Sequence, residues 1–219
     1  MYIISLGPHC ITKNAINKMK YISPTMPFDW MFSSLPFIKM ILIDNFNRLL
    51  NRDYIKSTNP CFSKDKSYNV LYNNSILHHP NITNHLLIKN ELCDYNNFHM
   101  WNHYNLLEDE QYTKYKKYID RFNNVLQMDD LKIFLYIQYY NHPIDEILDF
   151  NNYIMTRITN YKLLCIKCNK VDTKTDLFVC SYNHNNVYIY ELEIDTYQDD
   201  MEDIHLDKIK IIIDNIQNS

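Results

Sequence analysis

The chain has 219 residues and a formal net charge of −4, and its 46% hydrophobic and 22% charged residues are typical of a globular protein with a sizeable core. The negative charge argues against a protein that binds nucleic acid by neutralising phosphates, because such proteins usually carry a basic surface. The sequence contains no apolar run of the roughly 18 residues that cross a bilayer, and its first residues lack the basic segment of a signal peptide. We therefore expect a cytoplasmic protein with no nucleic-acid and no membrane partner.

The composition is strongly biased, with 19 tyrosines but a single glycine. Asn, Ile and Lys are abundant, which is typical of an AT-rich genome such as that of a large DNA virus or an AT-rich protist. For a viral protein, the expected location is the host cytoplasm or the virion. Asn-rich stretches are attributed to this bias rather than to function. The six cysteines are irregularly spaced and predict reduced thiols rather than a disulfide scaffold.

The N-terminal half begins with a short apolar run, Tyr2 to Leu6, which predicts a buried strand that ends at a turn containing Gly7. Apolar spacing predicts helices over residues 11–20 and 35–50. Residues 52–105 show little periodicity and are rich in Asn, His and Tyr, which indicates an irregular loop region or insertion. We expect this region to interrupt a single domain that spans residues 1–219.

The C-terminal half alternates helices with strands. Apolar residues recur every three or four positions over 108–127, with acidic residues at the start, where the helix dipole favours them. Further strands are predicted at 132–137, 162–166, 177–180 and 187–192, and further helices at 144–158 and 203–216. This order predicts an α/β fold: a single layered domain with a mostly parallel sheet, flanking helices and a C-terminal hairpin.

Cys10 is the best candidate for the chemical centre of the protein, because it follows the first strand and lies at the expected N-terminus of a helix. The positive end of the helix dipole lowers the pKa of a thiol there and raises its thiolate fraction. Gly7, the only glycine, indicates a backbone conformation at this turn that other residues do not readily adopt. The alternative for Cys10 is a small buried side chain with a structural role.

The segment Pro27-Phe28-Asp29-Trp30 places a carboxylate between two aromatic residues. In one interpretation it forms a turn in which Asp29 caps the following helix and Phe28 and Trp30 fill the core. In the other, Asp29 lies near Cys10, where it orients a histidine or contacts substrate. Both can hold together.

A cysteine nucleophile needs a base within hydrogen-bond reach. His103 is the first choice, and His79, His99 and His9 are the alternatives. The histidines between residues 78 and 103 do not reproduce the spacing of a standard zinc site, although His99 and His103 would share one helical face. We therefore expect neither a metal nor another cofactor. Cys165-x-x-Cys168 predicts two ordinary thiols rather than a dithiol centre.

Another enzyme class offers a different base. In hydrolases of the Gly-Asp-Ser-Leu type, the nucleophile follows the first strand and an acid-x-x-His pair lies near the C-terminus. Glu202 and His205 are similar to that pair in outline. We expect them instead to be solvated residues at a helix start.

Two motifs carry a resemblance to a known family. Ser5-Leu6-Gly7-x-x-Cys10, followed by Pro27-Phe28-Asp29-Trp30, resembles the N-terminal signature of the putative papain-like cysteine peptidases of bacteria and large DNA viruses. The resemblance continues through His103, the helical segment 115–122 and the strand 133–137, although Tyr104 stands where the family often has Asp. It implies Cys10 as nucleophile, a downstream histidine as base and a peptide or acyl substrate. Papain itself divides into a helical and a barrel-like half, whereas the pattern here predicts a layered sheet.

The sequence thus predicts a thiol-dependent hydrolase or acyl transferase. The thiolate of Cys10 would attack an acyl carbon with His103 as general base, and backbone amides at the helix start would stabilise the oxyanion. Gly7 and Trp30 are the candidate substrate-binding or oxyanion residues. The alternative is a non-catalytic binding protein that recognises a protein or a sugar nucleotide, with Cys10 merely packed.

Overall fold

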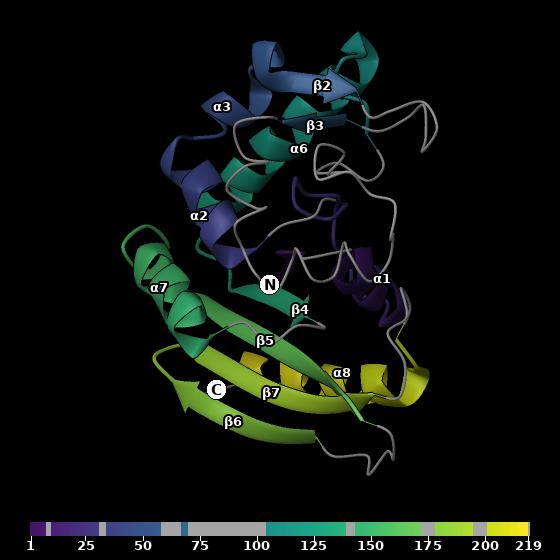
Figure 1. Ribbon diagram of the computed structural model, residues 1–219. Coiled ribbons are helices and arrows are strands. Elements are labelled where there is room, and N and C mark those ends of the chain that lie inside the picture. Colours follow the sequence, from purple (N-terminus) through teal and green to yellow (C-terminus); the bar gives the residue numbers. More distant parts are fainter. Residues whose placement is uncertain are drawn as a thin grey trace.

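The computed structural model describes residues 1–7, 10–30, 34–57, 67–69, 104–138, 143–171, 178–194 and 201–218. A five-stranded sheet with the order β1-β4-β5-β7-β6 forms its centre (Figure 1). The strands are β1 (Tyr2–Ser5), β4 (Lys132–Gln138), β5 (Tyr161–Lys170), β7 (Val187–Ile194) and β6 (Phe178–His184). The first four are parallel and β6 pairs antiparallel with β7. The predicted α/β fold with a C-terminal hairpin is confirmed.

Helices cover both faces of this sheet. One face packs against α2 (Leu35–Ile43), the short α3 (Asn47–Leu50), α6 (Asp109–Gln127) and α7 (Ile144–Met155). The other face packs against α1 (Cys10–Lys18) and α8 (Asp203–Gln217). Two short antiparallel strands, β2 (Ile55–Ser57) and β3 (Ser67–Asn69), follow the single turn η1 (Arg52–Tyr54). The rest of the predicted irregular region 52–105 lies almost entirely outside the described residues.

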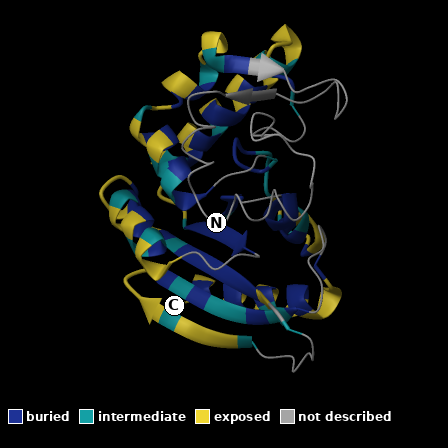
Figure 2. Cartoon of the chain, viewed as in Figure 1, coloured by how far each residue is buried: buried dark blue, intermediate teal, exposed yellow. Residues whose placement is uncertain are grey.

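The strands separate two apolar clusters. Along β4, Phe134 and Tyr136 join the cluster under α2, α6 and α7, whereas Ile133, Leu135 and Ile137 join the cluster under α1 and α8. Every residue of β4 is buried, as expected of a parallel strand covered on both faces. By contrast, β6 is largely exposed and forms an edge of the sheet (Figure 2).

The predicted single helix over 35–50 is wrong, because the chain breaks it after Ile43. Asn45 and Phe46 have φ angles of 52° and 63°. The Phe46 N–H donates to the Ile41 carbonyl at 3.0 Å and the Asn45 N–H donates to the Leu42 carbonyl at 3.4 Å. These two bonds form a Schellman motif, which closes α2 with an asparagine in the position that glycine usually occupies.

Asparagine takes the same left-handed conformation elsewhere. Among the described residues, six non-glycine residues have a positive φ, and four of them are Asn45, Asn160, Asn185 and Asn186. Asparagine tolerates this conformation better than most residues do. Asn185 and Asn186 form the tight turn between β6 and β7, so the Asn-rich stretch has a structural role in addition to its compositional origin.

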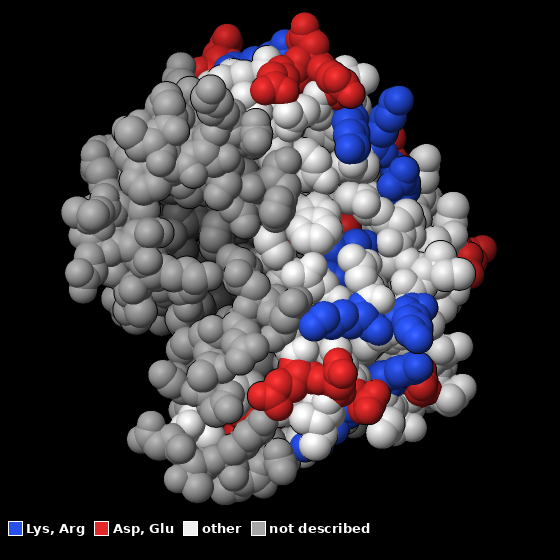
Figure 3. Space-filling model, turned by 90° about the vertical axis from the view of Figure 1, so that its right-hand side faces the viewer, with Lys and Arg blue, Asp and Glu red and all other residues white. Residues whose placement is uncertain are grey.

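The described surface carries mixed charge. On the face drawn in Figure 3, a group of Lys and Arg side chains lies directly beside a group of Asp and Glu side chains. No helix among the described residues is long and apolar enough to cross a membrane.

Candidate functional site

Cys10 is the first residue of α1, shortly after the carboxyl end of β1. The turn between them needs the lone glycine, because Gly7 has a φ of 79°. The Thr12 hydroxyl donates to the Gly7 carbonyl at 2.6 Å and accepts from the Ile137 N–H at 3.2 Å. The turn that precedes Cys10 is therefore fixed to the end of β4, the neighbouring strand.

The Cys10 side chain is buried, with 7% exposure, yet it belongs to neither apolar cluster. Its neighbours on α1, Ile11 and Ala15, do belong to the cluster under α1 and α8. Cys10 thus lies at the carboxyl edge of the sheet as a buried side chain. It is less open than the site we expected.

The other described thiols have different surroundings. Cys165 and Cys168 are buried in opposite clusters, one on each face of the sheet, so they cannot form a dithiol centre. Burial raises the pKa of the Cys165 thiol well above its usual value and that of Cys168 to about 12. Cys180 is exposed on β6. The prediction that Cys165 and Cys168 are ordinary thiols agrees with this geometry.

Asp29 pairs with Lys13, which lies three residues after Cys10 on α1. The Lys13 Nζ is 3.1 Å from Asp29 Oδ2, and the two side chains are 3% and 0% exposed. Asp29 Oδ2 also accepts from the Met26 N–H at 2.9 Å. Residues three apart on a helix share one face, so this ion pair connects the Pro27–Trp30 turn to α1 one turn beyond Cys10.

Lys13 also reaches the segment before that turn. Its Nζ donates to the Ser23 carbonyl at 2.8 Å, and the Ser23 hydroxyl donates to the Ile3 carbonyl on β1 at 2.8 Å. The Lys13 ammonium therefore contacts both ends of the segment 23–29, and the Ser23 hydroxyl holds that segment against the first strand.

Helix α6 fixes the Pro27–Trp30 turn from the other side. The Tyr115 hydroxyl donates to the Pro27 carbonyl at 2.8 Å, and Phe28 packs against Phe46 and Phe122 with ring centroids 5.8 and 5.5 Å away. Phe28 fills the core, as one interpretation held, and Trp30 is half-buried.

The expected capping role of Asp29 is wrong. The side chain that caps α2 is that of Ser34, whose hydroxyl accepts from the Phe37 N–H at 3.4 Å. Asp29 instead forms the buried ion pair with Lys13.

Burial raises the pKa of Asp29 to about 6, because desolvation disfavours its charged form. Lys13, the Met26 N–H and Arg121 act in the opposite direction without cancelling this effect. Asp29 Oδ1 has no hydrogen-bond partner among the described residues. A buried carboxylate with one unsatisfied oxygen and a pKa close to neutrality can accept a further donor.

Tyr104, the first described residue after His103, packs against two tyrosines of α6. Its ring lies 5.8 Å from those of Tyr115 and Tyr118. Burial raises the pKa of Tyr104, and the nearby Tyr118 and Asp29 raise it further.

The candidate bases His103, His99, His79 and His9 all lie outside the described residues. His205 is described, and the expectation that it is solvated is wrong: it is 2% exposed at the start of α8. Its neighbour Leu206 belongs to the cluster that α8 shares with α1. Within the described ranges, no group of three or more His, Cys, Asp or Glu side chains is arranged to hold a metal ion.

Three residues of this region were not identified from the sequence. Lys13 carried a usable signal, since it lies three positions after Cys10 on the same helical face. Thr12 and Gln138 carried none. Gln138 ends β4 fully buried, and neither of its amide atoms has a hydrogen-bond partner among the described residues. It adds an unsatisfied polar group to the carboxyl edge of the strand next to β1.

The comparisons with known proteins support the family resemblance. The family model described as "Putative papain-like cysteine peptidase (DUF1796)" matches residues 1–160, which include Cys10, the Pro27–Trp30 turn and His103. Comparison with curated proteins and with solved structures found no match. Because the match covers well over half of the sequence, this chain belongs to the putative papain-like cysteine peptidase family.

Proposed function

We propose that this protein is a thiol-dependent hydrolase or acyl transferase with Cys10 as its nucleophile. The observation that carries the proposal is the position of Cys10, which begins α1 at the carboxyl edge of the sheet, after the turn at Gly7. Ligands of open α/β sheets usually bind at this edge. The positive end of the α1 dipole favours the thiolate over the thiol. Membership of the family supports this chemistry at family level.

The proposed reaction is a two-step acyl transfer. The Cys10 thiolate attacks the acyl carbon and forms a C–S bond, and the resulting oxyanion is stabilised by backbone N–H groups at the start of α1. The oxyanion then collapses, which breaks the bond to the leaving group, and the leaving group takes a proton from the protonated base. In the second step the base removes a proton from water, or from another acceptor, which attacks the thioester and releases Cys10 as the thiolate.

We propose His103 as the base. Asp29 is among the groups that raise the pKa of Tyr104, the residue that follows His103 in the chain, and consecutive Cα atoms are about 3.8 Å apart. In this proposal the unsatisfied Oδ1 of Asp29 accepts a hydrogen bond from a ring N–H of His103 and orients the ring, as the third member of a catalytic triad does. Gly7 shapes the turn before the nucleophile, and Trp30 is proposed to contact substrate.

The test is site-resolved alkylation with iodoacetamide across a pH series, followed by mass spectrometry. We expect Cys10 to be labelled well below the ~8.5 of a free thiol. Exposed Cys180 provides an internal reference for accessibility, and buried Cys165 and Cys168 provide references for inert thiols. Labelling of Cys10 that follows the same pH dependence as Cys180 would refute an activated nucleophile.

His205 is the competing base, because it is buried at the start of α8 on the sheet face that α8 shares with α1. The alkylation rate of Cys10 should fall at neutral pH in His103→Gln and remain unchanged in His205→Gln. The reverse result would assign the base to His205 and remove Asp29 from its proposed orienting role.

The 7% exposure of Cys10 favours a second candidate function, a non-catalytic protein that binds a protein or a sugar nucleotide. This candidate predicts that Cys10 reacts no faster than Cys165 or Cys168 in the folded protein. It also predicts that Cys10→Ala binds such a partner with the same affinity as the wild-type protein. A small thioester substrate distinguishes the two, because only the hydrolase would turn it over in a Cys10-dependent manner.

A further inference from the structure

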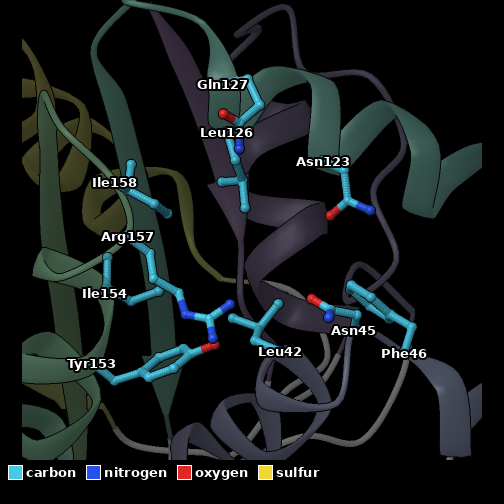
Figure 4. A pocket seen from close by; sticks show the side chains of 10 residues that line it. All are labelled: Leu42, Asn45, Phe46, Asn123, Leu126, Gln127, Tyr153, Ile154, Arg157 and Ile158. Carbon is cyan, nitrogen blue, oxygen red and sulfur yellow. The ribbon is translucent and has the colours of Figure 1, made fainter.

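A pocket lies at the amino ends of the strands, at the opposite end of the sheet from Cys10. It has a volume of about 310 Å³, within the lower range of small-molecule sites. Its walls come from the end of α2, the C-terminal parts of α6 and α7 and the loop after α7 (Figure 4). Helices α6 and α7 lead into the amino ends of β4 and β5, whereas Cys10 follows the carboxyl end of β1. The two places are therefore separated by the length of the strands.

The pocket has an apolar wall and a polar end. Leu42, Phe46, Leu126 and Ile154 line the apolar part. At the polar end the guanidinium of Arg157 lies over the Tyr153 ring, with its central carbon 4.9 Å from the ring centroid (Figure 4). A small ligand with an apolar body and one polar group would match this arrangement.

The polar end offers two hydrogen-bond donors to a ligand. The Tyr153 hydroxyl oxygen is buried and has no hydrogen-bond partner among the described residues. Burial raises the pKa of Tyr153, so this hydroxyl stays protonated and can donate. Arg157 forms no ion pair with any described residue, and none of the residues that line the pocket is acidic. Arg157 is exposed, so its guanidinium is open to solvent and to a ligand. A buried hydroxyl without a partner beside a positive charge favours an anionic group, and a planar carboxylate matches a guanidinium with two hydrogen bonds.

The backbone around the pocket is fixed by the Schellman motif that ends α2. Asn45 and Phe46, both in the left-handed conformation, line the pocket, and the hydrogen bonds of Phe46 to Ile41 and of Asn45 to Leu42 hold them there. The Phe46 side chain is 1% exposed and packs on Phe122 of α6. The apolar wall is thus held in place by packing, which lowers the entropic cost of binding a ligand.

We propose that this pocket binds a small monocarboxylate with an aromatic or branched apolar body. Arg157 and Tyr153 donate to the carboxylate, and Leu42, Phe46 and Ile154 contact the body. The amide side chains of Asn45, Asn123 and Gln127 also line the pocket. The site is independent of the acyl-transfer chemistry proposed for Cys10.

The probe is 3-phenylpropionate, titrated into the full chain and followed by ¹H–¹⁵N NMR. We expect a dissociation constant on the order of 0.1–1 mM, with the largest shifts in α7 and at the end of α2. The neutral 3-phenylpropionamide tests the charge, and propionate, which lacks the ring, tests the apolar contact. Both should bind at least about five-fold more weakly if each end of the pocket contributes a typical interaction.

Two variants locate the site and a third controls for charge. Arg157→Gln should weaken 3-phenylpropionate at least about five-fold with no effect on the amide, and Tyr153→Phe should weaken it several-fold. Lys210→Gln removes one positive charge from an exposed position of α8, on the other face of the sheet, and should change nothing. Any one of three results would overturn the proposal: equal affinity for the acid and the amide, unchanged affinity of Arg157→Gln for 3-phenylpropionate, or no saturable chemical-shift change up to about 10 mM ligand. All of these outcomes are independent of whether Cys10 reacts.

Discussion

The Lys13 ammonium and the Asp29 carboxylate lie 3.1 Å apart with almost no exposure to solvent, and they join α1 to the Pro27–Trp30 turn. A buried ion pair is costly to break from one side only, because the remaining charge stays desolvated. The pair therefore positions two parts of the candidate site and makes each dependent on the other.

Removing one partner should destabilise the protein strongly. Lys13→Met leaves Asp29 buried without its cation, and we expect a loss of about 3–5 kcal/mol in the free energy of unfolding, measured by urea denaturation. Asp29→Asn should cost less, because an amide oxygen can still accept from the Met26 N–H and Lys13 keeps its bond to the Ser23 carbonyl.

The double variant Lys13→Met/Asp29→Leu provides the control for that experiment. It removes both charges and should recover most of the stability lost in Lys13→Met, since no unpaired charge remains. Strictly additive losses in the double variant would mean that the two side chains do not interact in solution.

The raised pKa of Asp29 predicts a pH dependence of stability. Its folded pKa of about 6 lies above the ordinary value of 3.8, so protonation favours the folded state. Protonation of Asp29 contributes fully to the free energy of unfolding below about pH 4, and this contribution is lost as the pH rises through 6. The loss is roughly 3 kcal/mol, because the pKa differs by about two units between the folded and unfolded states. Denaturation at pH 4, 5, 6 and 7 should show wild type losing stability relative to Asp29→Asn over this range. A constant difference between the two proteins would contradict the raised pKa.

Thr12 couples the turn before Cys10 to β4, and its removal should affect both stability and reactivity. Thr12→Val leaves the Gly7 carbonyl and the Ile137 N–H without the bonds that the hydroxyl makes, which should cost about 2 kcal/mol. Thr12→Ser keeps the hydroxyl and should retain most of the stability. The alkylation rate of Cys10 should follow the same order, and equal rates in the two variants would show that this bridge does not position the thiol.

The fold could be predicted because its signals are local and periodic. The acidic start and the three-to-four spacing of α6, and the β-branched and aromatic run of β4, follow rules that depend on neighbouring residues. The break in the predicted helix over 35–50 was missed because Asn45 and Phe46 in place of glycine give no warning of a left-handed turn.

The candidate site was predictable only in part. Gly7 and Cys10 mark a turn that the chain order alone places at the end of a strand. The Lys13–Asp29 pair depends on the position of the Pro27–Trp30 turn, which Tyr115 of α6 holds by a hydrogen bond to the Pro27 carbonyl. The pocket beside Arg157 depends on the packing of three helices. Such long-range contacts leave no fixed spacing in a single sequence.

At the β6–β7 turn, two asparagines adopt the left-handed conformation that glycine usually takes. Asn185 and Asn186 have φ angles of 49° and 66°, which suits a two-residue turn of type I′. Asn186→Gly creates the Asn-Gly pair that such turns prefer and should leave the melting temperature unchanged or slightly higher. Asn186→Ala should lower the stability by about 1 kcal/mol, because a Cβ-bearing residue without a polar side chain disfavours this conformation. If alanine and glycine were equally stable at this position, the asparagines would be there because of composition alone.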